Sequence, residues 1–360
     1  MSSGWKMSPK VLTLATAVLV VLLALWLVVI PAGGSEVRLI DVAAGTSVHR
    51  IGHDLKEIGV IRSERCFLAL ARLIHLRIRA GEYGFKRANL IQVLRILSVG
   101  RVYLHRILVR EGDSIAQIAV VLGREKLADP ARFRRATANQ RLLSTLGVPA
   151  ETAEGYLFPD TYLIPRRMGE EKIVALMVRR FFDKLPRDLA ERAEKRGMSL
   201  NRAVTFASIV EREARAPEER ALISAVFHNR LKRGMPLQAD PTVLYALGRW
   251  DEKLAIKDLL IEHPYNTYRR PGLPPGPICS PGLACLAAAV EPAQADYLYF
   301  VTRKDGSGRH EFSKTLKAHE NAIKRSKERA KVAKASLAKE SAATPAVNET
   351  RRSPAASEAR

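Results

Sequence analysis

The chain has 360 residues, 47% of them hydrophobic and 27% charged, and this composition predicts a globular protein of two or three domains. The formal charge of +22 indicates an anionic partner, such as nucleic acid, anionic lipid or an acidic cell-wall polymer. The sequence has no zinc-ligand cluster, no aromatic-rich RNA-binding signature and no glycine-rich phosphate loop. Only the charge favours nucleic acid, and we therefore expect no nucleic-acid partner.

An uncharged run rich in Leu, Val and Ala extends from Val11 to Ile30, which is long enough to cross a bilayer as a helix. Lys6 and Lys10 precede the run, so the positive-inside rule predicts that residues 1–10 are cytoplasmic and the rest of the chain is outside. A cleaved signal peptide is the alternative, but the run is longer than a usual signal core and no clear A-x-A site follows it. The sequence favours an uncleaved single-pass anchor.

Two similar segments lie in the region 36–152, which we interpret as an N-terminal subdomain. One runs from Val42 to Leu55 and the other from Val109 to Leu122. Each predicts a strand, a glycine turn, a Ser or Asp helix cap and an amphipathic helix, and Ala80–Phe85 between them predicts another strand. The unit resembles the opening of LysM modules, which bind N-acetylglucosamine polymers. A common structural element without a ligand is the alternative.

The character of the sequence changes near residue 153, where a segment dense in aromatic and turn residues begins. Apolar spacing beyond it predicts helices near Glu170–Leu185, Leu200–Ala214 and Pro217–Arg233. Pro271–Pro277 predicts a loop and Tyr297–Val301 a strand. We expect a second domain over residues 153–323 and a basic tail over 324–360, which begins as a charged helix at most and ends disordered.

Two carboxylates near the end of the helix predicted at 200–214 are candidates for acid–base chemistry. Glu213 shares a helical face with Phe206, Ile209 and Val210. Loss of solvation on an apolar face raises the pKa of a carboxyl group, as a general acid requires near neutral pH. The helix C-terminus disfavours a negative charge further. Glu211 lies on a smaller, less apolar face. Spacing alone also allows both glutamates to be solvated and paired with neighbouring arginines.

Other nucleophile and ligand chemistries have less support. Ser208 and Ser280 have neither a G-x-S-x-G elbow nor an obvious histidine partner, and Cys279 lacks a nucleophile signature. Three cysteines are too few for a disulfide framework, although Cys279 and Cys285 could pair in an extracytoplasmic domain. The histidines at 228, 263, 310 and 319 show no i,i+4 metal spacing, so we expect no metal site and no cofactor.

Six motifs follow one another in a fixed order. They are EGYLFPDTY (154–162), ASIVEREA (207–214), FHNRL (227–231), LQADPTVLYALG (237–248), PYNTYRRPGLPPGPICSPG (264–282) and YLYFV (297–301). Together they resemble the endolytic murein transglycosylase family, also called the YceG-like family. The resemblance extends from the membrane helix to about residue 323. The probability that six motifs agree in this order by chance is very small.

The resemblance implies an α+β fold: a single-pass helix in the cell inner membrane, a LysM-like α/β module and a mixed catalytic domain distantly similar to lysozyme-like folds. It also implies a lyase that cleaves nascent glycan strands internally between N-acetylmuramic acid and N-acetylglucosamine. The product end is an anhydro-muramic acid, and elongation of the strand terminates. The family's catalytic glutamate lies in the segment matching ASIVERE. Glu213, followed by the small Ala214, fits better than the runner-up Glu211, although many relatives have Thr or Ser in place of Ala214.

Four downstream residues are our candidates for holding the sugars, because ring faces stack on aromatic side chains and hydroxyl groups bond to amides. These are Gln238, Asp240, Tyr265 and Asn266. The implied partners are peptidoglycan glycan strands, the cytoplasmic membrane and peptidoglycan synthases. A non-catalytic peptidoglycan-binding scaffold that regulates the synthases is the alternative function, and a hydrolase with the same site is a third.

Overall fold

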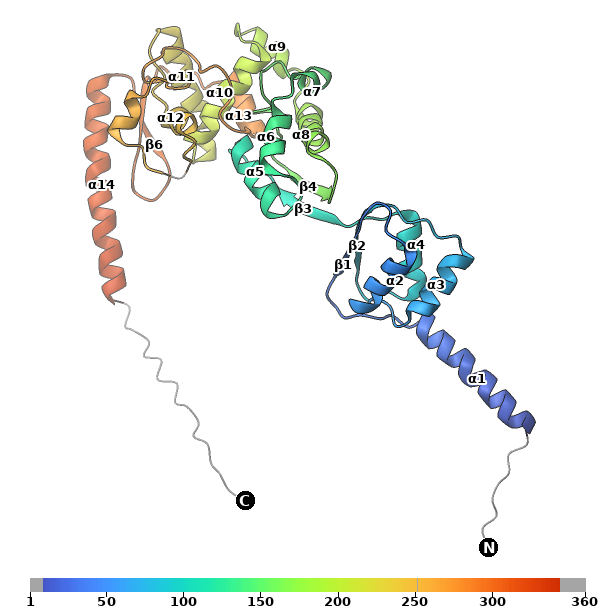
Figure 1. Ribbon diagram of the computed structural model, residues 1–360. Helices are drawn as coiled ribbons and strands as arrows, with labels where there is room; N and C mark the ends of the chain where they lie inside the picture. Colours follow the sequence, from blue (N-terminus) through green and yellow to red (C-terminus); the bar gives the residue numbers. More distant parts are fainter. Residues whose placement is uncertain (1–8, 251, 344–360) are drawn as a thin grey trace. The chain divides into compact units, whose positions relative to one another are not determined.

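The computed structural model describes residues 9–250 and 252–343, and combines helices with short antiparallel strand pairs (Figure 1). The chain divides into two compact units that interleave along the sequence. Unit 1 contains the described residues through Val109, then 115–142 and 160–177; unit 2 contains 110–114, 143–159 and the described residues from Val178 onward. The mixed α and β content confirms the coarse fold prediction, while the consecutive domains 36–152 and 153–323 stay a prediction.

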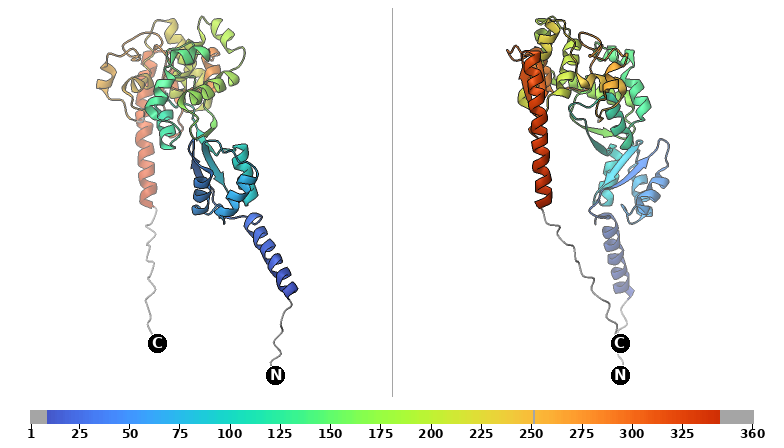
Figure 2. Two further views of the ribbon diagram at one scale, coloured as in Figure 1. Left: turned by 45° about the vertical axis from the view of Figure 1, so that its right-hand side comes forward. Right: turned by 90° about the vertical axis from the view of Figure 1, so that its left-hand side faces the viewer.

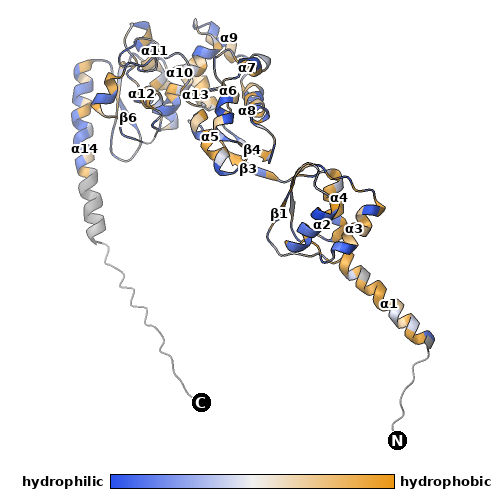
Figure 3. Ribbon diagram, in the orientation of Figure 1, coloured by the Kyte–Doolittle hydropathy of each residue, from blue (hydrophilic) through white to orange (hydrophobic). Residues whose placement is uncertain are grey.

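Helix α1 (Pro9–Val28) corresponds to the predicted membrane anchor and is mainly apolar after Lys10 (Figure 3). It is one continuous helix in both views of Figure 2. Among the described residues, its Lys10–Val28 portion is the one helix long and apolar enough to span a membrane. Arg62 holds its end: the guanidinium lies 4.6 Å from the centroid of the Trp26 ring and donates to the Pro31 carbonyl at 2.8 Å.

The first predicted strand–turn–helix segment lies in unit 1, whereas the turn of the second, residues 110–114, belongs to unit 2. The strand of the second segment ends at Leu108, one residue before the predicted Val109. In the first, β1 leads into α2, whose cap is Ser47: its hydroxyl accepts a hydrogen bond from the Arg50 N–H at 3.2 Å. Gly45 supplies the turn with a φ of +81°, a conformation that glycine adopts without strain. Besides α1, the whole elements of the unit are β1 (Arg38–Val42), α2 (Val48–Glu57), α3 (Glu64–Leu73), β2 (Gly81–Phe85), α4 (Leu90–Val99), β3 (Leu104–Leu108), α5 (Ile115–Arg124), α6 (Pro130–Thr137) and β4 (Thr161–Pro165).

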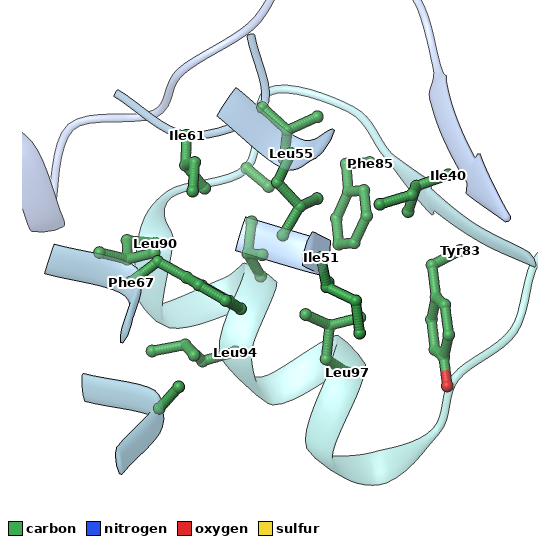
Figure 4. Close-up of a cluster of buried hydrophobic side chains, with 14 of the residues drawn as sticks. Ile40, Ile51, Leu55, Ile61, Phe67, Tyr83, Phe85, Leu90, Leu94 and Leu97 are labelled. Carbon is green, nitrogen blue, oxygen red and sulfur yellow. The ribbon is translucent and has the colours of Figure 1, made fainter. Parts of the chain in front are cut away.

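Side chains of β1, β2, α2, α3 and α4 form an apolar core in unit 1 (Figure 4). Strand β1 pairs with β2 in antiparallel register, with Ile40 opposite Tyr83. Tyr83, Leu55 and Phe67 are fully buried, because the apolar residues recur at the helical and strand periods that place them on the inner faces. The strands predicted at Val42 and Ala80–Phe85 are confirmed.

Unit 2 is mainly helical. Its whole elements are α9 (Leu189–Glu194), α10 (Leu200–Glu213), η1 (Pro217–Glu219), α11 (Arg220–Lys232), α12 (Asp240–Leu247), η2 (Ile256–Leu260), α13 (Leu283–Val290), β5 (Tyr299–Thr302), β6 (His310–Ser313) and α14 (Leu316–Ala343). Helices α7 (Gln140–Thr145) and α8 (Glu170–Lys184) cross the division between the units. Helix α10 packs against α13 and α11, and its buried residues run from Ala203 to Val210. The three helices predicted after residue 153 are confirmed, and residues 271–277 form a loop as predicted.

Helix α14 runs across Lys324, where the sequence places the start of the tail. The helix continues because it packs on β5 and β6: the Ser326 hydroxyl donates to the Thr302 carbonyl at 2.7 Å, and Arg325 Nε donates to Glu311 at 3.0 Å. The predicted charged helix at the start of the tail is thus part of α14, the boundary at 324 stays a prediction, and the predicted disordered end at 344–360 lies outside the described residues. Strand β5 starts two residues after the predicted Tyr297.

Candidate functional site

Glu213 is the last residue of α10. The helix is capped by Ser199, whose hydroxyl accepts from the Arg202 N–H at 3.3 Å, and it ends where Ala214 turns to an extended conformation with ψ of 108°. The Ala214 N–H still bonds to the Val210 carbonyl at 2.8 Å, which fixes the last turn. The apolar face predicted for Glu213 is real, because Phe206, Ile209 and Val210 are all buried. The chain thus presents Glu213 at a rigid helix end.

Glu213 lines a polar cavity of about 290 Å³ within unit 2. Three of the residues proposed for the site from the sequence line it together: Glu213, Gln238 and Asp240. The remaining lining comes from α11, β5, β6, α14 and the segments around α12: Arg230, Leu237, Tyr268, Phe300, Val301, Thr302, His310 and His319. Figure 1 shows α10, α11, α12 and β6 in the same part of the chain.

Cavity size alone does not identify the site. A larger cavity of about 600 Å³ lies in unit 1, next to α2 and α3, and no carboxylate lines it. Glycosidic bond cleavage requires a proton donor at the bond that breaks. The smaller cavity in unit 2 meets that requirement, and the larger one does not.

The surroundings of Glu213 raise its pKa to about 8. Removal from water is the largest cause, and the Asp240 carboxylate adds to it because two negative charges repel each other. The cations of Arg230, Arg212 and Arg215 act in the opposite direction and lower the pKa. Burial dominates over the arginines, so Glu213 is mostly protonated at neutral pH while still reaching the cavity.

Arg230 provides a fixed positive charge in the cavity wall. Its guanidinium is buried and donates through Nε to the Leu298 carbonyl and through Nη1 to the Leu237 carbonyl, both at 2.7 Å. The same group lies 5.3 Å from the centroid of the Tyr299 ring. Burial lowers the pKa of Arg230, but a guanidinium remains charged at neutral pH. The hydrogen bonds to these two carbonyls hold the positive charge on one side of the site.

Gln238 and Asp240 reach the cavity through an unusual backbone segment. Gln238 has a φ of +51°, which is uncommon for a residue with a side chain, and its N–H donates to the Thr267 carbonyl at 3.1 Å. Asp240 begins α12 and accepts a hydrogen bond from the Tyr268 hydroxyl. Burial and the Asp240 charge both raise the pKa of Tyr268, so this phenol stays a donor. The strained turn and this bond place the two polar side chains beside Glu213.

Glu211, the other candidate, has structural partners. Its Oε2 accepts from the Gly282 N–H at 2.8 Å, at the start of α13, where the helix dipole favours a negative charge. The Cys285 thiol also bonds to Glu211, and burial together with this bond raises the pKa of the thiol. Glu211 does not line the Glu213 cavity. Its contacts tie α10 to α13.

Tyr265 and Asn266, the other two sugar-binding candidates, lie away from the cavity lining. The Asn266 amide is buried and bonded on both sides: Nδ2 donates to the Leu259 and Ile261 carbonyls at 2.9 Å, and Oδ1 accepts from the Tyr268 N–H at 3.0 Å. The Tyr265 ring packs 4.8 Å from that of Tyr245. Their sugar-binding role stays a prediction, and neither enters the proposals below.

The cysteines and Ser208 have structural environments. Cys279 and Cys285 are free thiols, and the Cys279 thiol donates to the Ser208 carbonyl at 3.3 Å. The Ser208 hydroxyl is buried, donating to the Thr205 carbonyl at 2.7 Å and accepting from the Ile278 N–H at 3.0 Å. These two hydrogen bonds hold the Ser208 hydroxyl within the fold.

Several cavity residues are absent from the candidates that the sequence provides. Arg230 and Tyr268 lie inside recognised motifs but have no local signature of their own. His310 and His319 lie in a polar segment after the last motif, 97 and 106 residues beyond Glu213 in the printed numbering. Only the tertiary fold brings them to the cavity. A pattern search over short spacings has no signal for them.

Comparison with known proteins gives consistent matches. The model of the YceG-like family matches residues 40–325. A protein of Bacillus subtilis (strain 168), named endolytic murein transglycosylase, is 34% identical over 304 residues, which cover 79% of this chain and 83% of that protein. A Streptococcus pneumoniae protein of the same name is 29% identical over 305 residues, covering 76% of this chain and 55% of the longer pneumococcal protein.

A solved structure resembles the fold as well. The crystal structure of a YceG-like protein from Listeria monocytogenes is 31% identical in sequence and superposes with a TM-score of 0.57. The match covers 79% of this chain and 98% of that one. Sequence and fold therefore agree over most of the described residues.

Proposed function

The chain belongs to the YceG-like family, and on that premise we propose that it is a membrane-anchored enzyme that cleaves nascent murein glycan strands internally. The curated relatives, at 29–34% identity over most of the chain, support the enzyme class of endolytic murein transglycosylase. The observation that carries the proposed mechanism is Glu213: it lines a polar cavity and has its pKa raised to about 8. A carboxyl group in this state can donate a proton near neutral pH.

The proposed reaction uses Glu213 first as an acid and then as a base. Protonated Glu213 donates to the oxygen between N-acetylmuramic acid and N-acetylglucosamine as the bond from that oxygen to C1 breaks. The N-acetyl group of the muramic acid stabilises the cation at C1. Ionised Glu213 then takes the proton of the C6 hydroxyl, whose oxygen bonds to C1. No water is consumed, and the product carries an anhydro-muramic end.

One carboxylate is sufficient for this sequence of steps. Most glycosidases use two, because a second group must activate water or form a covalent bond. Here the nucleophile belongs to the substrate, and an intramolecular group already has a high effective concentration. Asp240 has another part in the proposal: its charge helps to keep the proton on Glu213. Gln238 and Asp240 are also placed to bond sugar hydroxyls in the cavity.

The remaining parts of the chain fit a location at the membrane. We propose that α1 is a single-pass anchor with its N-terminus in the cytoplasm and that unit 2 works in the periplasm, where new glycan emerges. The two strand–turn–helix segments are proposed to bind glycan as LysM modules do, and peptidoglycan synthases are the proposed neighbours. The high positive charge of the chain supports contact with an acidic wall polymer.

Mass spectrometry of glycan ends tests the proposed reaction. The full chain in detergent is incubated with purified sacculi and with uncrosslinked glycan strands, and the soluble and shortened products are analysed. The proposal expects new anhydro-muramic ends inside the strands. New reducing ends would indicate a hydrolase, and glycan binding without any cleavage would indicate the scaffold.

A further inference from the structure

His310 and Glu219 form a buried pair in the wall of the site. Glu219 is the last residue of η1, which follows α10 shortly after Glu213 in the chain. His310 is the first residue of β6. His310 Nδ1 lies 2.7 Å from Glu219 Oε2, and the His310 backbone N–H donates to both carboxylate oxygens at 3.0 Å. His310 is 4% exposed and Glu219 6%. Neither residue has a part in the mechanism above.

These bonds fix where the imidazole carries its proton. A backbone N–H is always a donor, so both oxygens of Glu219 act as acceptors, which fits an ionised carboxylate. Nδ1 must then be the donor in its bond to the same carboxylate. In a neutral ring the lone pair is left on Nε2. The Phe300 ring, in an edge contact at 5.3 Å, limits rotation of the imidazole.

The free nitrogen belongs to a residue that lines the Glu213 cavity. In the described part of the chain, no protein group forms a hydrogen bond with Nε2 of His310, whereas Nδ1 is fully used. Nε2 is also accessible, because it is not among the fully buried side-chain atoms that lack a hydrogen-bond partner. An acceptor that a carboxylate holds in one orientation, beside a proposed acid, suits a donor on the substrate. Sugar hydroxyl groups are such donors.

We propose that His310 is a substrate-contacting residue whose Nε2 accepts a hydrogen bond from a hydroxyl of the sugar bound beside Glu213. Glu219 is its positioning residue, since it fixes the tautomer and the ring. The inference rests on the proposed transglycosylase function. The two roles are separate: Glu213 supplies the proton, and Nε2 of His310 only accepts a bond.

Two replacements at one position separate this role from a purely structural tie between η1 and β6. In His310→Gln the side-chain oxygen comes close to the place of Nε2, so the acceptor in the cavity is retained. In His310→Asn the amide lies close to the place of Nδ1, so the contact with Glu219 is retained and the cavity contact is lost. The same two replacements at His53, on α2 and paired at 3.8 Å with Glu64, serve as matched controls.

The readout is the rate of anhydro-muramic end formation by the full chain on uncrosslinked glycan, with the melting midpoint of each variant recorded. We expect His310→Asn to lower kcat/KM by about tenfold or more, since loss of one hydrogen bond costs about that factor. We expect His310→Gln to stay within about threefold of the wild type, and both His53 variants within about twofold. Equal rates in the two His310 variants, or a faster Asn variant, would overturn the proposal.

A second measurement does not depend on the folding of the His310 variants. In Glu213→Gln protein labelled with ¹⁵N-histidine, a murein tetrasaccharide of alternating N-acetylglucosamine and N-acetylmuramic acid is titrated. We expect the Nε2 resonance of His310 to start as an unprotonated nitrogen and to move on binding, and an unmoved resonance at saturation contradicts the contact. If wild-type protein forms no anhydro ends, the transglycosylase function fails first; if it does form them, only the His310 assignment is in question.

Discussion

The cavity beside Glu213 and the contact between Glu211 and α13 occupy two sides of one helix end. Residues two apart on an α-helix point roughly 200° from each other, so the two carboxylates meet different surroundings. Glu211 forms hydrogen bonds with the Gly282 N–H and the Cys285 thiol. Glu213 is removed from water, lies near the Asp240 charge and lines the cavity. A carboxylate with structural partners stabilises the fold, whereas one in a cavity with a raised pKa is available for proton transfer.

The largest difference between the two sides is expected in turnover. Glu213→Gln keeps the size and polarity of the side chain but removes the proton that is transferred, so we expect the rate of anhydro-end formation to fall by about 10²–10⁴-fold. Glu211→Gln keeps an acceptor for Gly282 and is expected to stay within about tenfold of the wild type. Product quantification by liquid chromatography on the same glycan preparation measures both. The opposite ranking would assign the acid to Glu211.

The second difference is in stability against pH. The pKa of Glu213 is about 8 in the folded protein and close to 4.5 in the unfolded chain, so the folded state binds the proton more tightly. The stabilisation from this proton is fully present below pH 4.5 and is lost as the pH rises through 8. Glu213→Gln removes this titration, and at pH 9 we expect it to be more stable than the wild type by about 1–3 kcal/mol. Urea unfolding at pH 5 and pH 9 measures the change. A constant difference between variant and wild type across that range would show that the carboxyl group is not held protonated.

The third test concerns the structural side. Glu211→Ala removes the acceptor at the start of α13, and we expect the free energy of unfolding to fall by about 1 kcal/mol. Glu211→Gln is the matched control, because its amide oxygen can still accept from Gly282. Denaturant titration of both variants at pH 7 compares them. Equal stability of the alanine variant and the wild type would remove the structural role given to Glu211.

The smallest expected effect concerns the tuning of the acid by its neighbour. Asp240 raises the pKa of Glu213, so Asp240→Asn is expected to lower it and to move the alkaline limb of the pH–rate profile to lower pH. Any lost sugar contact would lower the rate at every pH without moving the limb, which separates the two roles of Asp240. The profile of kcat/KM between pH 5 and pH 10 provides the measurement. A limb that stays in place would leave burial as the one cause of the raised pKa.

The helical period was enough to predict the apolar face of Glu213, because Phe206, Ile209 and Val210 lie within two turns of it. It could not reveal the partner of Glu211, since Gly282 is 71 residues away along the chain. The same limit applies to Arg230 and His310, which reach the cavity through the tertiary fold. Asn266 shows another limit: an amide that binds sugar and an amide that bonds to backbone carbonyls are the same residue type, and only burial distinguishes them.

The titration of the Glu213 carboxyl group tests the central claim most directly. Carboxyl resonances of protein labelled with ¹³C at the glutamate side chains are followed from pH 4 to pH 10 in the wild type and in Glu213→Gln. The account predicts one carboxyl group that titrates near pH 8 in the wild type and is missing from the variant. A Glu213 signal that titrates near its ordinary value of 4.5 would contradict the account, because the group would then be ionised at neutral pH and unable to act as the acid.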